Sequence, residues 1–273
     1  MKQESLLRSL ASYYATMMRT QLMMQFQYRA STYMYTLGMV AEPTIYLVVW
    51  STIARSHGGT VDGLTPHAFA AYYIVWTLVR TMNIVFTPYG WEERIREGQF
   101  SSDLLRPLHP IHSDLAMFAG QKLVWVLMYL PIAIGLSLVF HPSLHPGAVQ
   151  IVVFFFAIWG AYFLRTFIQS TIGMLNFWTT RGAAVFDLYM PAELLLSGRL
   201  LPLKLMPGWA QTLANFFPFK WTFFFPIESL VGNLSTQALL LGLAAQVGWI
   251  AGCVLLFRFA WRAAIKRFSA VGG

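Results

Sequence analysis

The stretch Tyr89–Asp114, YGWEERIREGQFSSDLLRPLHPIHSD, is a polar segment in an otherwise apolar chain. It holds eight of the chain's 30 charged residues (19 basic and 11 acidic), and long apolar runs flank it on both sides. Pro88 prevents the preceding apolar run from continuing into it as one helix, and Gly98 is a natural helix end. Pro107 and Pro110 keep the segment LLRPLHP extended. The sequence therefore predicts a short polar helix and an extended segment between two apolar helices.

The short helix, WEERIREG, has one apolar edge. Trp91 and Ile95 share a face at i,i+4 spacing, and Glu92 and Arg96 are spaced to form an ion pair. A charged helix with an apolar edge is typical of a docking site for a soluble protein, although an ordinary solvated loop has a similar composition.

The composition of the 273-residue chain is that of an integral membrane protein. Hydrophobic residues make up 57% and charged residues 11%, against about 25% charged in a soluble domain. The net charge of +8 does not indicate nucleic-acid binding, because the basic residues lie beside apolar runs rather than in one patch. With Cys253 as the sole cysteine, one chain cannot form a disulfide or a cysteine-based metal centre. We expect no cleavable signal peptide within residues 1–30.

Six stretches are apolar enough to span a membrane, which takes about 20 residues. They are Tyr33–Ala54, His67–Phe86, Leu115–Phe140, Val149–Trp178, Ala183–Leu201 and Gln237–Trp261. Residues 1–30 precede them as a basic amphipathic helix that suits the headgroup region of the bilayer, or else packs on protein. The prediction is one all-α, polytopic membrane domain covering residues 1–273.

The basic residues predict the orientation, because cytoplasmic loops are enriched in Lys and Arg. With both termini in the cytoplasm, eleven basic residues lie on that side and four on the other. The eleven are Lys2, Arg8, Arg19, Arg29, Arg94, Arg96, Arg106, Arg181, Arg262, Lys266 and Arg267; the four are Arg55, Arg199, Lys204 and Lys220. This orientation places residues 89–114 in the cytoplasm, which favours the docking hypothesis. A bacterial inner membrane fits the pattern.

The segment Arg199–Gly232 is too apolar for an external loop, yet its prolines divide it into pieces too short to span. PGWAQTLANFF and KWTFFFPIESLVG are predicted as two short helices, forming a re-entrant hairpin in the outer half of the bilayer that protein must cover. A seventh, kinked span is the alternative, but it would place the C-terminus outside.

Ionisable residues inside spans are costly and therefore informative. Candidates for lining a polar path are Glu42, Arg165, Asp187 and Glu193, and the alternative is a buried ion pair or a subunit contact. Arg80 and Lys122 lie near span ends, where a structural role is expected. His109 and His112 are spaced to share a metal, although a solvated pair is the stronger interpretation. The chain has no P-loop, HExxH or GxSxG motif, so any ATP-driven role needs a separate ATPase.

Three stretches carry a resemblance to the permease subunits of type-2 ABC exporters. IREGQFSSDLLRPLHP, Ile95–Pro110, is similar to a signature of one subgroup with an LLRPL coupling loop. SGRLLPLKLMPGWAQTLANFFPF, Ser197–Phe219, resembles the family's outer re-entrant segment, and the terminal RFSAVGG, Arg267–Gly273, resembles that subgroup's AVGG ending. The layout of the whole chain also fits this family.

The resemblance implies a translocation path formed with a second permease, which is either a copy of this chain or a different one. Nucleotide-binding subunits would carry ATP and Mg, with no cofactor on this chain. The coupling helix would be residues 91–98, with Trp91 and Ile95 making the contact and Glu92, Glu93, Arg94 and Arg96 setting its register. The aromatic residues of the hairpin suit a lipidic cargo or anchoring in membrane lipid. Alternative functions are an ion-gradient-driven secondary transporter using Glu42, Asp187 or Glu193, and a membrane-embedded enzyme or scaffold.

Overall fold

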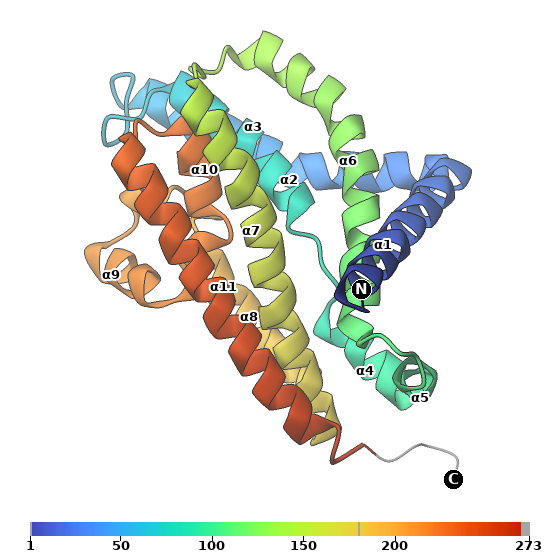
Figure 1. The fold of residues 1–273 in the computed structure, drawn as a ribbon. Coiled ribbons are helices and arrows are strands. Elements are labelled where there is room, and N and C mark those ends of the chain that lie inside the picture. Colours follow the sequence, from blue (N-terminus) through green and yellow to red (C-terminus); the bar gives the residue numbers. More distant parts are fainter. Residues whose placement is uncertain (1, 180, 269–273) are drawn as a thin grey trace.

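The computed structural model describes residues 2–179 and 181–268, and this part of the chain contains helices and no strand (Figure 1). The α-helices are α1 (Lys2–Gln27), α2 (Arg29–Ser56), α3 (Pro66–Met82), α4 (Pro88–Arg96), α5 (Gln99–Leu104), α6 (Pro110–Phe140), α7 (Ala148–Gly173), α8 (Gly182–Leu196), α9 (Gly208–Phe216), α10 (Phe224–Val231) and α11 (Thr236–Ala264). Short 3-10 turns occur at η1 (Met174–Phe177), η2 (Leu203–Leu205) and η3 (Pro218–Trp221). The predicted all-α membrane fold is confirmed; the AVGG ending at 270–273 lies outside the described residues.

Four segments are long and apolar enough to cross a membrane: Ala30–Ser56, Pro110–Phe140, Ala148–Phe177 and Thr236–Ala264. They correspond to the predicted first, third, fourth and sixth spans. The predicted second and fifth spans form the shorter helices α3, with 17 residues, and α8, with 15. These two helices extend for roughly 25 Å and 22 Å, short of the roughly 30 Å hydrocarbon core. Six crossings therefore stay a prediction.

Helices α7 and α11 lie side by side and form the spine of the molecule (Figure 1). A buried glutamine joins them: Gln246 Nε2 donates to the Ala157 carbonyl and to the Trp221 carbonyl, at 2.9 Å each. Gly160 leaves room for this amide, since a Cβ there would meet the Gln246 side chain at 2.6 Å. Because Gln246 belongs to α11 and the two carbonyls belong to α7 and η3, this one side chain holds the three elements together.

Helix α1 packs along α6 with one face and exposes apolar side chains on the other. At the crossing, a Cβ on Gly120 would lie 2.8 Å from the Met18 Cα, so only glycine permits this approach. Tyr14 and His112 are hydrogen-bonded nearby at 2.9 Å. The exposed face carries Leu7, Met23, Met24 and Phe26. One face of α1 thus packs on protein, and its other face is suited to contact lipid.

The segment that follows α8 forms two short helices, α9 and α10, joined through η3. Helix α10 lies between α3, α7 and α11, and a Cβ on Gly242 of α11 would clash with the Phe225 ring at 2.1 Å. Helix α9 lies at the periphery, where Trp209 and Phe216 are exposed (Figure 1). The buried half of the hairpin is therefore covered by protein, as irregular backbone in a membrane requires. Its depth in the bilayer stays a prediction.

Candidate functional site

Helices α4 and α5 form a polar platform, residues 88–107, at one end of the bundle (Figure 1). Gly98 turns the chain between them with a positive φ of 73°, which favours glycine. The Phe100 ring of α5 contacts Phe177 of η1, Trp261 of α11 and Phe268 beyond α11, at centroid distances of 5.2 to 5.8 Å. The platform is thus attached to the ends of the two spine helices.

Trp91 points into the bundle and not toward a partner. Its side chain is fully buried, and its indole lies against Gly173, where a Cβ would come within 2.5 Å of the ring. Ile95 packs in the same cluster and is partly buried. This differs from the expectation that Trp91 carries a contact to another protein. The apolar edge of α4 packs against the bundle of its own chain. The amphipathic pattern alone does not determine whether such an edge packs internally or against another protein.

Arg94 also has an internal role. Its guanidinium bonds the buried carboxylate of Asp114 in α6 at 2.7 Å and lies over the Phe86 ring at 4.2 Å. Asp103 of α5 is 3.6 Å away. Arg94 therefore joins the platform to the start of α6. The expected Glu92–Arg96 ion pair does not occur among the described residues.

The exposed surface of the platform carries several charged side chains and a leucine. Glu93, Arg96 and Glu97 are exposed, and so is Arg106. Leu105, next to Arg106 in the chain, has 88% of its surface exposed. A large apolar residue in this setting is a typical anchor for a protein interface. Sequence reasoning missed Leu105, since the pair Leu104-Leu105 does not reveal which leucine faces inward.

The predicted path residues Arg165 and Glu193 form a buried ion pair between α7 and α8. Two nitrogens of Arg165 bond both carboxylate oxygens at 2.9 and 2.8 Å, and Glu193 is inaccessible to solvent. Tyr189 donates a hydrogen bond of 2.6 Å to the same carboxylate, and Arg165 also donates to the Asn83 carbonyl. Of the two expectations for these residues, a polar path or a buried ion pair, the structure shows the buried ion pair.

Glu42 of α2 is shared between two arginines. Arg80 of α3 lies 2.6 Å from its carboxylate, and Arg199, in the turn after α8, lies 3.7 Å away. Gly198 has a positive φ of 79°, and Tyr72 donates a hydrogen bond of 2.7 Å to its carbonyl, so the turn brings Arg199 back toward α2. Arg80 thus has a defined partner within the bundle.

The remaining ionisable candidates do not join this network. Asp187 of α8 accepts a hydrogen bond from Tyr89 of α4, and this bond raises the pKa of Tyr89 from its ordinary value. The His109 ring lies against the Trp261 ring in a tilted arrangement, with 4.0 Å between the ring centroids, whereas His112 and Tyr14 are hydrogen-bonded. The described residues contain no group of three or more side chains suited to hold a metal.

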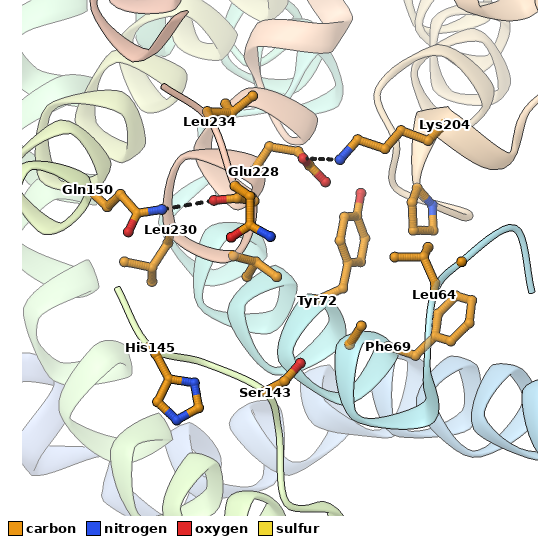
Figure 2. A pocket seen from close by; sticks show the side chains of 16 residues that line it. Leu64, Phe69, Tyr72, Ser143, His145, Gln150, Lys204, Glu228, Leu230 and Leu234 are labelled. Atoms are coloured by element: carbon orange, nitrogen blue, oxygen red, sulfur yellow. Dashed lines mark hydrogen bonds and ion pairs between the residues drawn. The ribbon is translucent and has the colours of Figure 1, made fainter. Parts of the chain in front are cut away.

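Figure 2 shows a cavity of about 490 Å3, and its lining residues lie at the end of the bundle opposite the platform (Figure 1). The loops after α2, α6 and α10 meet there, as does η2. Figure 2 shows Lys204 and Glu228 paired across one wall, at 2.6 Å, and Gln150 bonded to the Gly232 carbonyl on another side. These interactions fasten loops to one another, so this end of the bundle is held together by polar side chains.

Comparison with protein families matches residues 40–272, most of the chain, to the family described as ABC-2 family transporter protein. No curated protein matches the chain.

Proposed function

The chain belongs to the ABC-2 transporter family, and from that premise we propose that it is the permease subunit of an ATP-driven exporter. As a multi-pass membrane component it would form the translocation path together with a second permease, either a copy of itself or a different chain. Separate nucleotide-binding subunits would supply ATP and Mg. The distribution of basic residues supports cytoplasmic termini and a bacterial inner membrane.

The observation that carries the proposal is the platform itself. It presents exposed charged side chains and the exposed Leu105 at one end of the bundle, while its inner side is attached to the helices that form the membrane domain. We assign the ATPase contact to the exposed residues Leu105, Glu93, Arg96 and Arg106. Glu92 and Ile95 lie at the edge of this surface, and Trp91 and Arg94 transmit the movement.

Three attachments give the platform a mechanical connection to the bundle. Arg94 holds Asp114 of α6, Trp91 packs on Gly173 of α7, and Phe100 packs on Trp261 of α11. A push on the platform by an ATPase would therefore act on α6, α7 and α11 together. Because packed interfaces of this kind transmit displacement rather than absorb it, ATP-driven closure of the ATPase subunits can move the helices.

The experiment is purification of the tagged chain in mild detergent, with mass spectrometry of the associated proteins and an ATPase assay. The proposal predicts a P-loop ATPase in near-equal amount and ATP hydrolysis in the eluate. Mass spectrometry also distinguishes a second copy of this chain from a different permease. The opposite result is a chain without any ATPase, under conditions that preserve other membrane complexes, together with ion-gradient-driven transport.

A further inference from the structure

Three arginines reach one concavity of about 510 Å3 between α2, α3, α7 and the turn after α8. They are Arg80, Arg165 and Arg199, and each comes from a different element. The rest of the lining is nearly all apolar: Met34, Tyr35, Gly38, Ile84 and Met190. On α2, Met34 and Tyr35 are exposed at its rim. The concavity thus combines a cationic interior with an apolar edge.

Among the described residues, two carboxylates accompany these three arginines. Glu193 pairs with Arg165, and Glu42 is shared between Arg80 and Arg199. Lys122 adds another basic group behind the concavity, fully buried, where it contacts the Ile84 carbonyl and the Tyr162 ring instead of a carboxylate. The site therefore has at least one more arginine than carboxylates.

Arg199 is the least compensated of the three arginines. Its side chain is 13% exposed, and its carboxylate partner Glu42 is 3.7 Å away and already held at 2.6 Å by Arg80. Its Nε has no hydrogen-bond partner among the described residues. A guanidinium in apolar surroundings gains strongly from an added anion, because little water is available to solvate it.

We propose that this concavity binds the anionic group of an amphiphile, a phosphate or carboxylate, with Arg199 as its main contact. The apolar part of the molecule lies along Met34, Tyr35 and Met190. The rim belongs to Ala30–Ser56, a segment suited to span the membrane, so a molecule with an apolar tail reaches the site more readily than a soluble anion. This inference rests on the proposed function and deepens it, since it names the class of cargo.

Gly38 provides a matched pair of variants. It lines the concavity, and a Cβ there has no heavy atom within 4 Å. Gly38→Asp adds an internal carboxylate beside the arginines, whereas Gly38→Asn has the same shape without the charge. Both residues have similar helix propensity, so the pair isolates the charge.

The test is native mass spectrometry of the full-length chain in a neutral detergent, titrated with dioctanoyl phosphatidate, dioctanoyl phosphatidylcholine or inorganic phosphate. Phosphatidate should bind most tightly. Gly38→Asp should weaken its binding by about tenfold or more, as expected for a neutralised cationic site, and Gly38→Asn should leave it within about twofold. Equal binding by the two variants overturns the proposal, and so does displacement by inorganic phosphate at the same concentration as phosphatidate.

A second variant keeps the test decisive if Gly38→Asp does not fold. Arg199→Gln removes the least compensated arginine and should also lose phosphatidate binding, whereas Arg55→Gln, at the exposed end of α2, should not. Phosphatidate binding unchanged in Arg199→Gln contradicts the proposal. The measurement needs no ATPase, so a chain that recruits an ATPase without binding phosphatidate refutes this inference alone.

Discussion

At the scale of single residues, the buried charges are held in specific pairs. Arg165 and Glu193 share two short hydrogen bonds in the bundle interior, and Tyr189 completes the coordination of the carboxylate. Removing one partner leaves the other charge buried without compensation, and that is the costly change. Replacing both removes the charge and the requirement for a partner.

We therefore predict that Arg165→Met lowers the stability of the folded chain by about 3–5 kcal/mol, and that Arg165→Met with Glu193→Gln recovers much of it. Thermal unfolding of the purified chain in detergent measures both effects. A single variant as stable as the unmodified chain would show that the pair does not stabilise the fold.

His109 makes stability depend on pH. Burial, with a smaller effect from nearby His112, lowers the pKa of His109 from its ordinary 6.5 to about 4. Between pH 6.5 and pH 4, His109 is therefore protonated in the unfolded chain and neutral in the folded chain. The contribution of neutral His109 to the free energy of unfolding is present above pH 6.5 and is lost as the pH falls toward 4.

The expected result is that His109→Phe, which keeps an aromatic ring against Trp261, reduces the fall in melting temperature between pH 6.5 and 4. The exposed His57 provides the control, and His57→Phe should leave the fall unchanged. The same pH dependence in His109→Phe and the unmodified chain would refute this assignment.

Residue types could be predicted from the sequence, but their partners could not. Ionisable residues in apolar runs identified Glu42, Arg165 and Glu193 as important. Their pairing depends on the turn at Gly198, which returns Arg199 to Glu42, and on the packing of α7 against α8, which joins Arg165 to Glu193. Trp91 shows the same limit, because an apolar edge of a helix fits a partner and the bundle equally well.

At the scale of elements, the contact of α1 with α6 depends on a single glycine. The Met18 backbone lies where a side chain at Gly120 would begin, with Cα at 2.8 Å and the carbonyl oxygen at 2.9 Å. Gly135 lies on the same helix, and a Cβ there meets nothing within 4 Å.

We predict that Gly120→Leu separates α1 from α6, while Gly135→Leu does not. Limited trypsin digestion measures the separation: Arg8 and Arg19 are exposed on α1, and a detached helix unfolds locally and is cleaved faster at these sites. Faster cleavage is expected in the first variant only. Equal protection of α1 in both variants would contradict this packing.

The long helices followed from the sequence because their apolar runs exceed the length of a span. The ends of the short helices were not predicted correctly. Helix α3 ends at Met82, four residues before the predicted end at Phe86, and α8 ends at Leu196, five residues before the predicted end at Leu201. At the end of α3, Asn83 donates a hydrogen bond to the Thr222 carbonyl of the hairpin segment, which is far away in the sequence. Local composition does not reveal such a tertiary contact.

At the scale of the whole molecule, the two surfaces of the platform have different roles. The inner surface, with Trp91 and Arg94, attaches the platform to the bundle, and the outer surface, with the exposed Leu105, is where we propose that an ATPase binds. Mutations in the two surfaces should therefore have different effects on the stability of the fold. Trp91→Ala should destabilise the fold by about 3–5 kcal/mol, as for other large buried side chains, whereas a change at Leu105 should leave the fold intact.

The amount of ATPase that co-purifies with Leu105→Asp tests the docking role of the platform most directly. Thr60→Asp, which adds the same charge to an exposed loop at the opposite end, is the control. We predict that Leu105→Asp stays folded in the membrane and loses most of its ATPase, while Thr60→Asp retains it. Full retention of the ATPase by Leu105→Asp, with ATP hydrolysis still coupled to transport, would contradict it.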